Sequence, residues 1–94
     1  MSEPAPTGNG AVLMYTTAWC PYCQQARQLL RDKGIAFAEV DVDAEPQRRA
    51  EMFERSKGEY TVPQIFIGSQ HIGGADDLQA LEESGGLSAL LAGR

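Results

Sequence analysis

The sequence predicts one α/β domain, in which a four-stranded mixed sheet is flanked by helices. Short apolar runs of strand length alternate with longer stretches of helical spacing in the order β-α-β-α-β-β-α, and 94 residues suffice for one small domain. A strand–helix–strand unit implies a parallel strand pair with a right-handed crossover. Residues 1–10, which are mostly Pro, Gly, Ser and Thr, are typical of a flexible tail, so the domain is expected over residues 11–94.

The first strand is expected at residues 11–15, where the continuous apolar run AVLMY fits a strand buried on both faces. The first helix is expected over residues 21–33. Pro21 is favoured in a first turn, because its missing N–H would have no partner there. Apolar residues recur at helical spacing from Tyr22 onward, and Gly34 is a natural C-terminal stop.

The second strand is expected at residues 36–41, which are rich in branched residues and alternate in part. A second helix, over residues 45–57, has a proline in its first turn and a glycine after its last. Its apolar face, formed by Ala50 and Phe53 with Met52 beside them, is modest. We therefore expect this helix to be well exposed.

The third and fourth strands, at residues 64–67 and 70–74, are separated by a Gly-Ser turn and predict a hairpin. A last helix is expected over residues 76–84. It pauses at two glycines and continues as an apolar turn over residues 87–91. The hairpin adds two antiparallel strands to the parallel pair.

Composition excludes several classes of protein. Thirteen acidic and eight basic residues give a net charge of −5, which suits solubility and disfavours general nucleic-acid binding, where Lys and Arg face phosphate. No run approaches the roughly 18 apolar residues of a membrane span, and the N-terminus lacks the pattern of a secretory signal. A cytoplasmic location is therefore expected, and there thiols are kept reduced.

The two cysteines, Cys20 and Cys23, are separated by two residues. They could form a structural disulfide, bind a metal ion or act as a reactive pair. As a disulfide staple they would close so small a loop that little unfolded-state entropy is removed. A structural zinc site needs about four ligands, and the chain offers one further candidate, His71, which is expected to be a surface or hydrogen-bonded strand residue. A reactive pair fits best.

The position of the pair favours this reading. Strand, loop and then cysteine at a helix start places the Cys20 sulfur beside unpaired N–H groups and the positive end of the helix dipole, which favour the thiolate nucleophile. Cys23 lies one turn further along, near enough to attack a mixed disulfide on Cys20. Pro63 is either an ordinary turn residue or part of a cis Val62–Pro63 peptide facing the cysteine helix.

Three separated motifs resemble those of glutaredoxins: CPYC at residues 20–23, TVPQIFIG at residues 61–68 and GGADDL at residues 73–78. The resemblance covers about residues 12–91. It implies a thioredoxin-like fold and glutathione-dependent thiol–disulfide exchange, in which Cys20 attacks a glutathionylated protein and Cys23 resolves protein disulfides.

The resemblance also implies a glutathione site, with glutathione as co-substrate, no tightly bound cofactor and no metal. Val62 would pair its backbone with the cysteinyl part, and the helix start after GG would receive the γ-glutamyl end. Expected partners are glutathione and proteins with disulfides or glutathionylated thiols, met by a monomer. The glutathione-binding residues implied are Tyr22, Thr61, Val62, Pro63, Gly74, Ala75, Asp76 and Asp77.

This sequence departs from the family pattern where a cation is common. Thr17 stands where many members carry Lys, and Glu59 and Tyr60 stand where a basic residue is frequent. We therefore expect weaker glutathione affinity than in a Lys-bearing relative, with the chemistry intact. Three residues are candidates for binding the glycyl carboxylate instead: Arg48, Arg49 and Lys57.

Two alternatives share the fold. One is an iron–sulfur carrier that acts as a cluster-bridged dimer, which Pro21 disfavours because it stiffens the helix start. The other is an electron donor fed by thioredoxin reductase, which the TVP and GGADDL segments disfavour.

Overall fold

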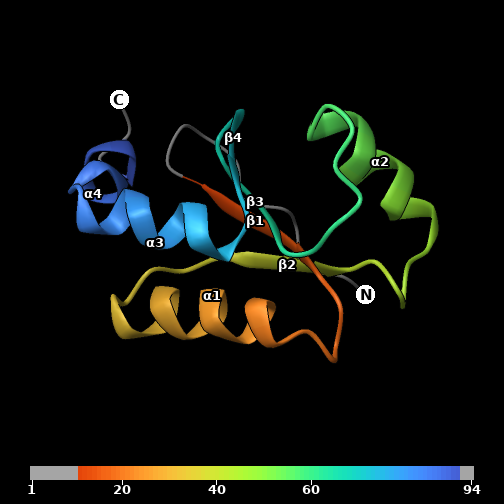
Figure 1. Cartoon of the computed structure of the whole chain (residues 1–94), viewed down its shortest axis with the longest axis horizontal. Helices are drawn as coiled ribbons and strands as arrows, with labels where there is room; N and C mark the ends of the chain where they lie inside the picture. The colour runs from red at the N-terminus through yellow and green to blue at the C-terminus, as the bar shows by residue number, and fades with distance from the viewer. Residues whose placement is uncertain (1–10, 92–94) are drawn as a thin grey trace.

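The computed structural model describes residues 11–91. The expected tail, residues 1–10, and the last three residues of the expected domain lie outside this range. Eight elements follow one another along the chain (Figure 1). They are β1 (Val12–Thr16), α1 (Pro21–Asp32), β2 (Ala38–Asp41), α2 (Gln47–Arg55), β3 (Gln64–Ile67), β4 (Gln70–Gly73), α3 (Ala75–Glu83) and α4 (Gly86–Leu91).

The four strands form one mixed sheet in the order β2-β1-β3-β4. β1 and β2 are parallel, with Leu13 opposite Ala38, whereas β3 is antiparallel to both β1 and β4. The β3–β4 pairing shifts register between Ile65 and Phe66. The predicted parallel unit and terminal hairpin are thus confirmed.

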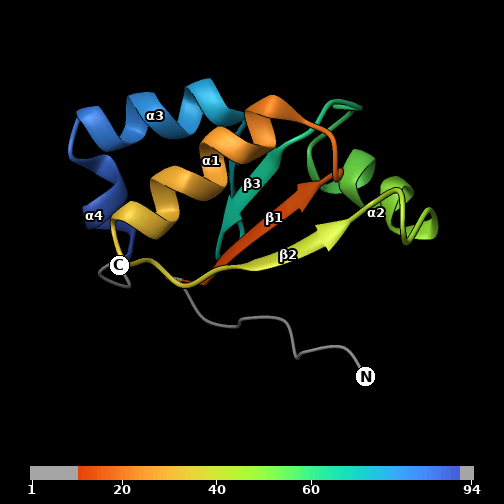
Figure 2. The same ribbon diagram turned by 90° about the horizontal axis from the view of Figure 1, so that it is seen from below.

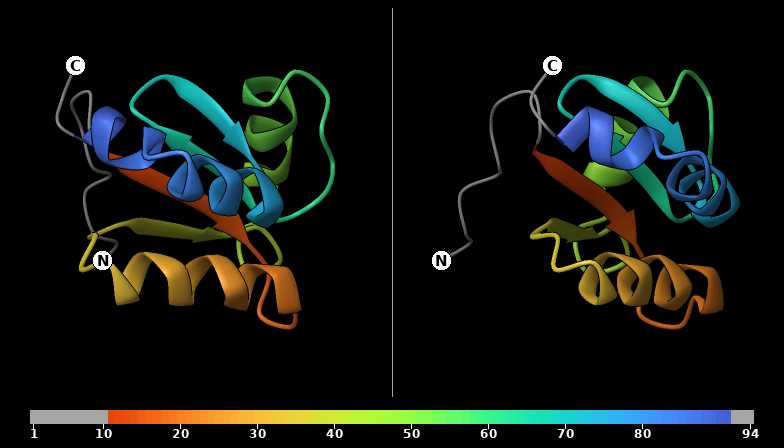
Figure 3. Two further views of the ribbon diagram at one scale, coloured as in Figure 1. Left: turned by 60° about the vertical axis from the view of Figure 1, so that its left-hand side comes forward. Right: turned by 90° about the vertical axis from the view of Figure 1, so that its left-hand side faces the viewer.

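Helices cover both faces of the sheet. α1 and α3 lie side by side on one face (Figure 2), while the strands separate α1 from α2 (Figure 3). Because successive strand residues point to opposite faces, Met14 and Ile65 pack toward α1, α3 and α4. Tyr15 and Phe66 pack toward α2.

The core on the α1 face is the larger of the two. Its buried members come from two strands and three helices, and they are Val12, Met14, Ala26, Leu30, Ile65, Ile67, Ala75, Leu78 and Leu87. The core on the α2 face is formed by Tyr15, Val40, Val42, Met52 and Phe66. α1 therefore buries more side chains in its core than α2 does.

Several sequence expectations need correction. β1 begins at Val12 and extends one residue beyond the expected range, to Thr16, which is fully buried. The expected pause at the two glycines is confirmed, with Gly85 at φ +81°, and the expected turn after it is the helix α4. On α2 only Met52 is fully buried, whereas Ala50 is exposed and Phe53 half-buried, so the predicted apolar face was wrong in detail. The expected exposure of that helix is confirmed.

No helix within residues 11–91 has the length and apolar character needed to cross a membrane.

Candidate functional site

The Cys20 sulfur lies between the first turn of α1 and the loop before β3. Cys20 has extended backbone angles (φ −111°, ψ 111°) and is the N-cap of α1. Its Sγ accepts a hydrogen bond from the Cys23 N–H at 3.2 Å, and its thiol donates to the Val62 carbonyl at 3.5 Å. The sulfur thus satisfies one of the helix donors that would otherwise have no partner.

Cys23 lies in the first turn of α1 and is fully buried. Both cysteines are free thiols. Burial, together with the interaction with Cys20, raises the pKa of Cys23 to about 12, although the Thr17 backbone and Arg27 act in the opposite direction. At neutral pH Cys23 is therefore a protonated thiol.

A cation lies behind the cysteine pair. Arg27, whose side chain is only 11% exposed, forms an ion pair with Glu39 of β2, in which Nε lies 2.7 Å from Oε2. Its Nη2 also donates to the Thr17 carbonyl at 3.4 Å. Thr16 Oγ1 donates to the same Glu39 oxygen at 2.7 Å. The ion pair thus connects α1, β2 and the loop that leads to Cys20.

The electrostatics of this pair are set by close contact. Burial raises the pKa of Glu39, but the hydrogen bonds from Arg27 and Thr16 outweigh burial, so its pKa is lowered overall. Sequence reasoning missed Arg27. The available signal was its position four residues after Cys23, which places both on one face of the helix.

A cleft of about 500 Å³ opens beside Val62. The Val62–Pro63 peptide is cis, the second of the two readings that the sequence left open. All the residues that the family resemblance implied for glutathione line this one cleft. They are Tyr22, Thr61, Val62, Pro63, Gly74, Ala75, Asp76 and Asp77.

The cleft is bordered by the start of α3. The Gly74 N–H donates to Asp77 Oδ2 at 3.0 Å, so this donor is already occupied by the chain's own carboxylate. Gly73 adopts φ +116°, a backbone conformation that favours glycine, and a Cβ there would meet the Asp77 carboxylate. The N–H groups of Ala75 and Asp76, in the first turn, have no partner within the helix.

A hydrogen-bonded chain fixes the other wall of the cleft. The buried Gln64 side chain donates to both the carbonyl (3.0 Å) and the hydroxyl (3.2 Å) of Thr61. Its Oε1 lies 2.6 Å from His71 Nε2, and the His71 ring stacks on Phe66. His71 is thus a hydrogen-bonded strand residue, as expected. The same contacts tie the loop carrying Val62 to the sheet.

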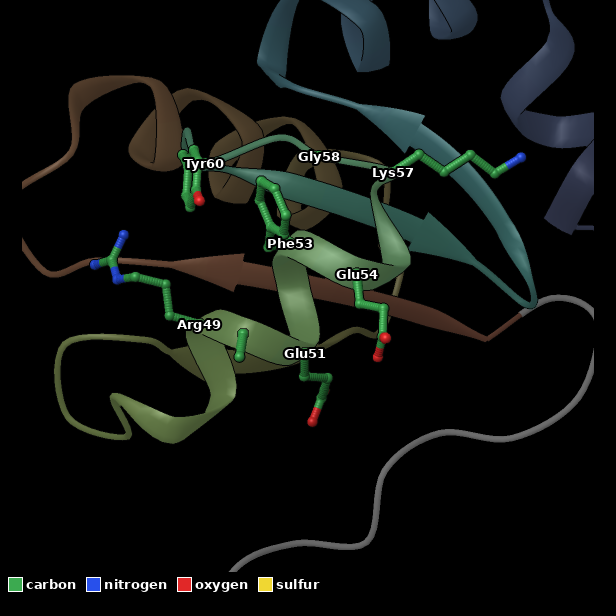
Figure 4. Close-up of a pocket in the computed structure, with 8 residues that line it drawn as sticks. Arg49, Glu51, Phe53, Glu54, Lys57, Gly58 and Tyr60 are labelled. Atoms are coloured by element: carbon green, nitrogen blue, oxygen red, sulfur yellow. The ribbon is translucent and has the colours of Figure 1, made fainter.

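The candidate cations for a glycyl carboxylate lie elsewhere. Arg48 is paired with Glu51 at 2.9 Å, and Arg49 with Asp43 at 2.9 Å. Lys57 borders a different, shallow depression of about 1010 Å³ over α2, which contains neither cysteine. There it points away from the stacked Phe53 and Tyr60 rings (Figure 4).

Within residues 11–91, no three His, Cys, Asp or Glu side chains are grouped so that one chain could hold a metal ion. A cluster shared between two chains is a separate arrangement and stays a prediction.

Comparisons with known proteins identify the family of this chain. The glutaredoxin family model matches residues 12–72. A glutaredoxin of Pseudomonas aeruginosa is 58% identical over 80 residues, covering 85% of this chain and 94% of the relative.

Solved structures show the same fold. The solution structure of glutaredoxin from Brucella melitensis is 53% identical and has a TM-score of 0.75, covering 93% of this chain and 94% of that one. A buckwheat glutaredoxin–glutathione complex is 26% identical with a TM-score of 0.79, covering 86% and 76%. The fold is thioredoxin-like, and the chain belongs to the glutaredoxin family.

Proposed function

We propose that the protein is a glutathione-dependent thiol–disulfide oxidoreductase that reduces glutathionylated proteins and protein disulfides. The observation that carries the proposal is the position of the Cys20 sulfur. It lies at a helix N-cap, receives the Cys23 N–H and faces Val62 at the edge of the cleft. One backbone donor, the Cys23 N–H, is thus aimed at the sulfur that would carry the attack on a disulfide.

The reaction is a sequence of disulfide exchanges. Cys20 thiolate attacks the glutathione sulfur of a mixed disulfide, and the target thiolate leaves and takes up a proton. The Cys20–glutathione disulfide is then attacked by a second glutathione thiolate. This step releases oxidised glutathione and regenerates the Cys20 thiolate. The net reaction consumes one free glutathione, because the other half of the oxidised glutathione comes from the mixed disulfide itself.

The contacts of Val62 suggest how glutathione is oriented. In the free protein the Val62 carbonyl accepts from the Cys20 thiol. Once Cys20 is deprotonated, that carbonyl is free to accept from the cysteinyl N–H of glutathione, as in an added strand. The γ-glutamyl carboxylate is placed at the N–H groups of Ala75 and Asp76, because Asp77 already occupies Gly74.

Cys23 has a narrower role. In the free protein, burial and the interaction with Cys20 raise the pKa of Cys23 to about 12, so its thiol is a poor nucleophile there. Release of the glutathione bound to Cys20 is therefore assigned to a second glutathione. Cys23 is needed where the target holds an internal disulfide, and a Cys20–Cys23 disulfide is the product.

The test is turnover of a glutathionylated disulfide with glutathione, glutathione reductase and NADPH. We expect Cys20→Ser to abolish turnover and Cys23→Ser to retain it, because the second thiol is not used. An equal loss in both variants would contradict the assigned roles. Turnover that requires thioredoxin reductase and ignores glutathione would instead favour the alternative electron donor.

A further inference from the structure

Two exposed aromatic side chains lie within two residues of Cys20 along the chain. They are Trp19, 94% exposed, and Tyr22, 57% exposed. Trp19 immediately precedes Cys20, and Tyr22 lines the cleft. The third exposed aromatic side chain within residues 11–91, Tyr60, stacks on Phe53 in the separate depression over α2. Exposed aromatic rings next to a nucleophile indicate a contact surface.

The same place is acidic. Three carboxylates line the cleft, from Glu59, Asp76 and Asp77, and no Lys or Arg does so. Asp77 is engaged by the Gly74 N–H. Glu59 and Asp76, both exposed, remain as open charges.

Cations outside the cleft do not offset these carboxylates. Arg27, beside the cysteine pair, is largely buried and paired with Glu39, and Arg49, which lines the depression over α2, is paired with Asp43. The net charge of the whole chain is −5. A ligand that approaches Cys20 therefore meets solvent-exposed aromatic rings and negative charges that few positive charges balance.

We propose that this aromatic–acidic surface, formed by Trp19, Tyr22, Glu59 and Asp76, binds an arginine or lysine side chain next to the glutathionylated cysteine of a protein substrate. The inference rests on the proposed function and names its substrate class. Aromatic faces attract cations, and Trp does so most strongly. Carboxylates on the same surface add charge complementarity.

Adjacency to the nucleophile decides which part of the substrate is contacted. Trp19 and Tyr22 flank Cys20 in sequence, and Tyr22 lines the same cleft as Val62, which contacts the Cys20 thiol. During the attack, the target sulfur lies in line with the bond that forms between Cys20 and glutathione. The residues on either side of the target cysteine then face the rings of Trp19 and Tyr22. An acidic segment would be repelled there.

The test uses three glutathionylated peptides of one length, in which both neighbours of the cysteine are Arg, Gln or Glu. Flanking cations also make the peptide thiol a better leaving group. Each rate is therefore divided by the rate of the same peptide with glutathione alone. We expect the corrected kcat/KM to be about fivefold higher for Arg than for Gln, as one exposed cation–π contact provides, and lowest for Glu.

Variants of Trp19 separate aromatic attraction from simple apolar contact. Trp19→Leu keeps apolar bulk and should reduce the Arg-to-Gln ratio at least twofold, whereas Trp19→Phe should largely keep it. Neither should alter turnover of the mixed disulfide of glutathione and 2-mercaptoethanol, because Trp19 does not line the cleft. Raising the salt concentration should also reduce the ratio.

Equal corrected rates for the Arg and Gln peptides would overturn the inference while leaving turnover of the small mixed disulfide intact. An Arg preference unchanged in Trp19→Leu would exclude the aromatic contact. Failure to turn over even the small mixed disulfide would instead overturn the proposed function.

Discussion

Replacing Glu39 by Gln tests the ion pair behind the cysteines. One Glu39 oxygen accepts from two nitrogens of Arg27 and from the hydroxyl of Thr16, and the Arg27 and Glu39 side chains are 11% and 29% exposed. Glutamine keeps the shape and one acceptor but loses the charge. A hydrogen bond to a charged group contributes about 1.5–3 kcal/mol and a neutral one about 0.5–1.5 kcal/mol. The expected loss in the free energy of unfolding at pH 7 is therefore about 1–2 kcal/mol.

The loss of stability in Glu39→Gln should depend on pH in a defined direction. The pKa of Glu39 is lowered in the folded protein from its usual value of 4.5. A lowered folded-state pKa gives stability that is present above the unfolded pKa and is lost as pH falls. The difference between wild type and Glu39→Gln should thus be full at pH 7 and shrink below about pH 4.5.

The assay is urea unfolding of the reduced proteins between pH 7 and pH 3, supported by melting temperatures, where each kcal/mol amounts to about 4–8 °C in a domain of this size. The matched control is Glu82→Gln, which removes the partner of the exposed Lys33 and should change stability little. Equal stability of wild type and Glu39→Gln at pH 7 would refute the reasoning. A difference that persists undiminished at pH 3 would show that charge is not its cause.

Two further changes test the cleft and the core. Thr17→Lys places a cation before Cys20 and should raise kcat/KM for a glutathione mixed disulfide about fivefold, as expected for about 1 kcal/mol of added attraction. The control is Thr17→Met. An unchanged or lower kcat/KM in Thr17→Lys would count against the argument from the missing cation. Leu30→Ala, at a fully buried position of α1, should lower the free energy of unfolding by about 2–5 kcal/mol. Denaturant titrations measure this loss, and the control is Gln25→Ala at an exposed position of the same helix. A similar small loss in both variants would contradict the assigned core.

The elements that sequence predicted best are those with strong local signals. Residues 64–67 were placed without error because an apolar run lies between a proline and a Gly-Ser turn, and that strand is buried along its length. Gly34 ends α1 as expected and adopts φ +70°. Cys20 and Cys23 could be predicted to form one site because they are separated by only two residues in the sequence.

The features that sequence did not predict depend on how elements pack. The Arg27–Glu39 pair joins a helix to a strand twelve residues away, and nothing local selects that partner. Tyr22, one of the apolar positions used to predict the helix, lies 57% exposed beside the cleft because the helix face toward the core is defined by Ala26 and Leu30.

The reactive sulfur is also a structural part of its helix, because Cys20 Sγ accepts the first-turn N–H of Cys23. If the proposed disulfide exchange takes place at this sulfur, each disulfide makes it a poorer acceptor, and the cap of α1 is weakened and restored in every cycle. Ala26 and Leu30 hold the helix to the sheet from further along its length. The proposed reacting end of α1 is thus separate from the part that keeps the helix folded.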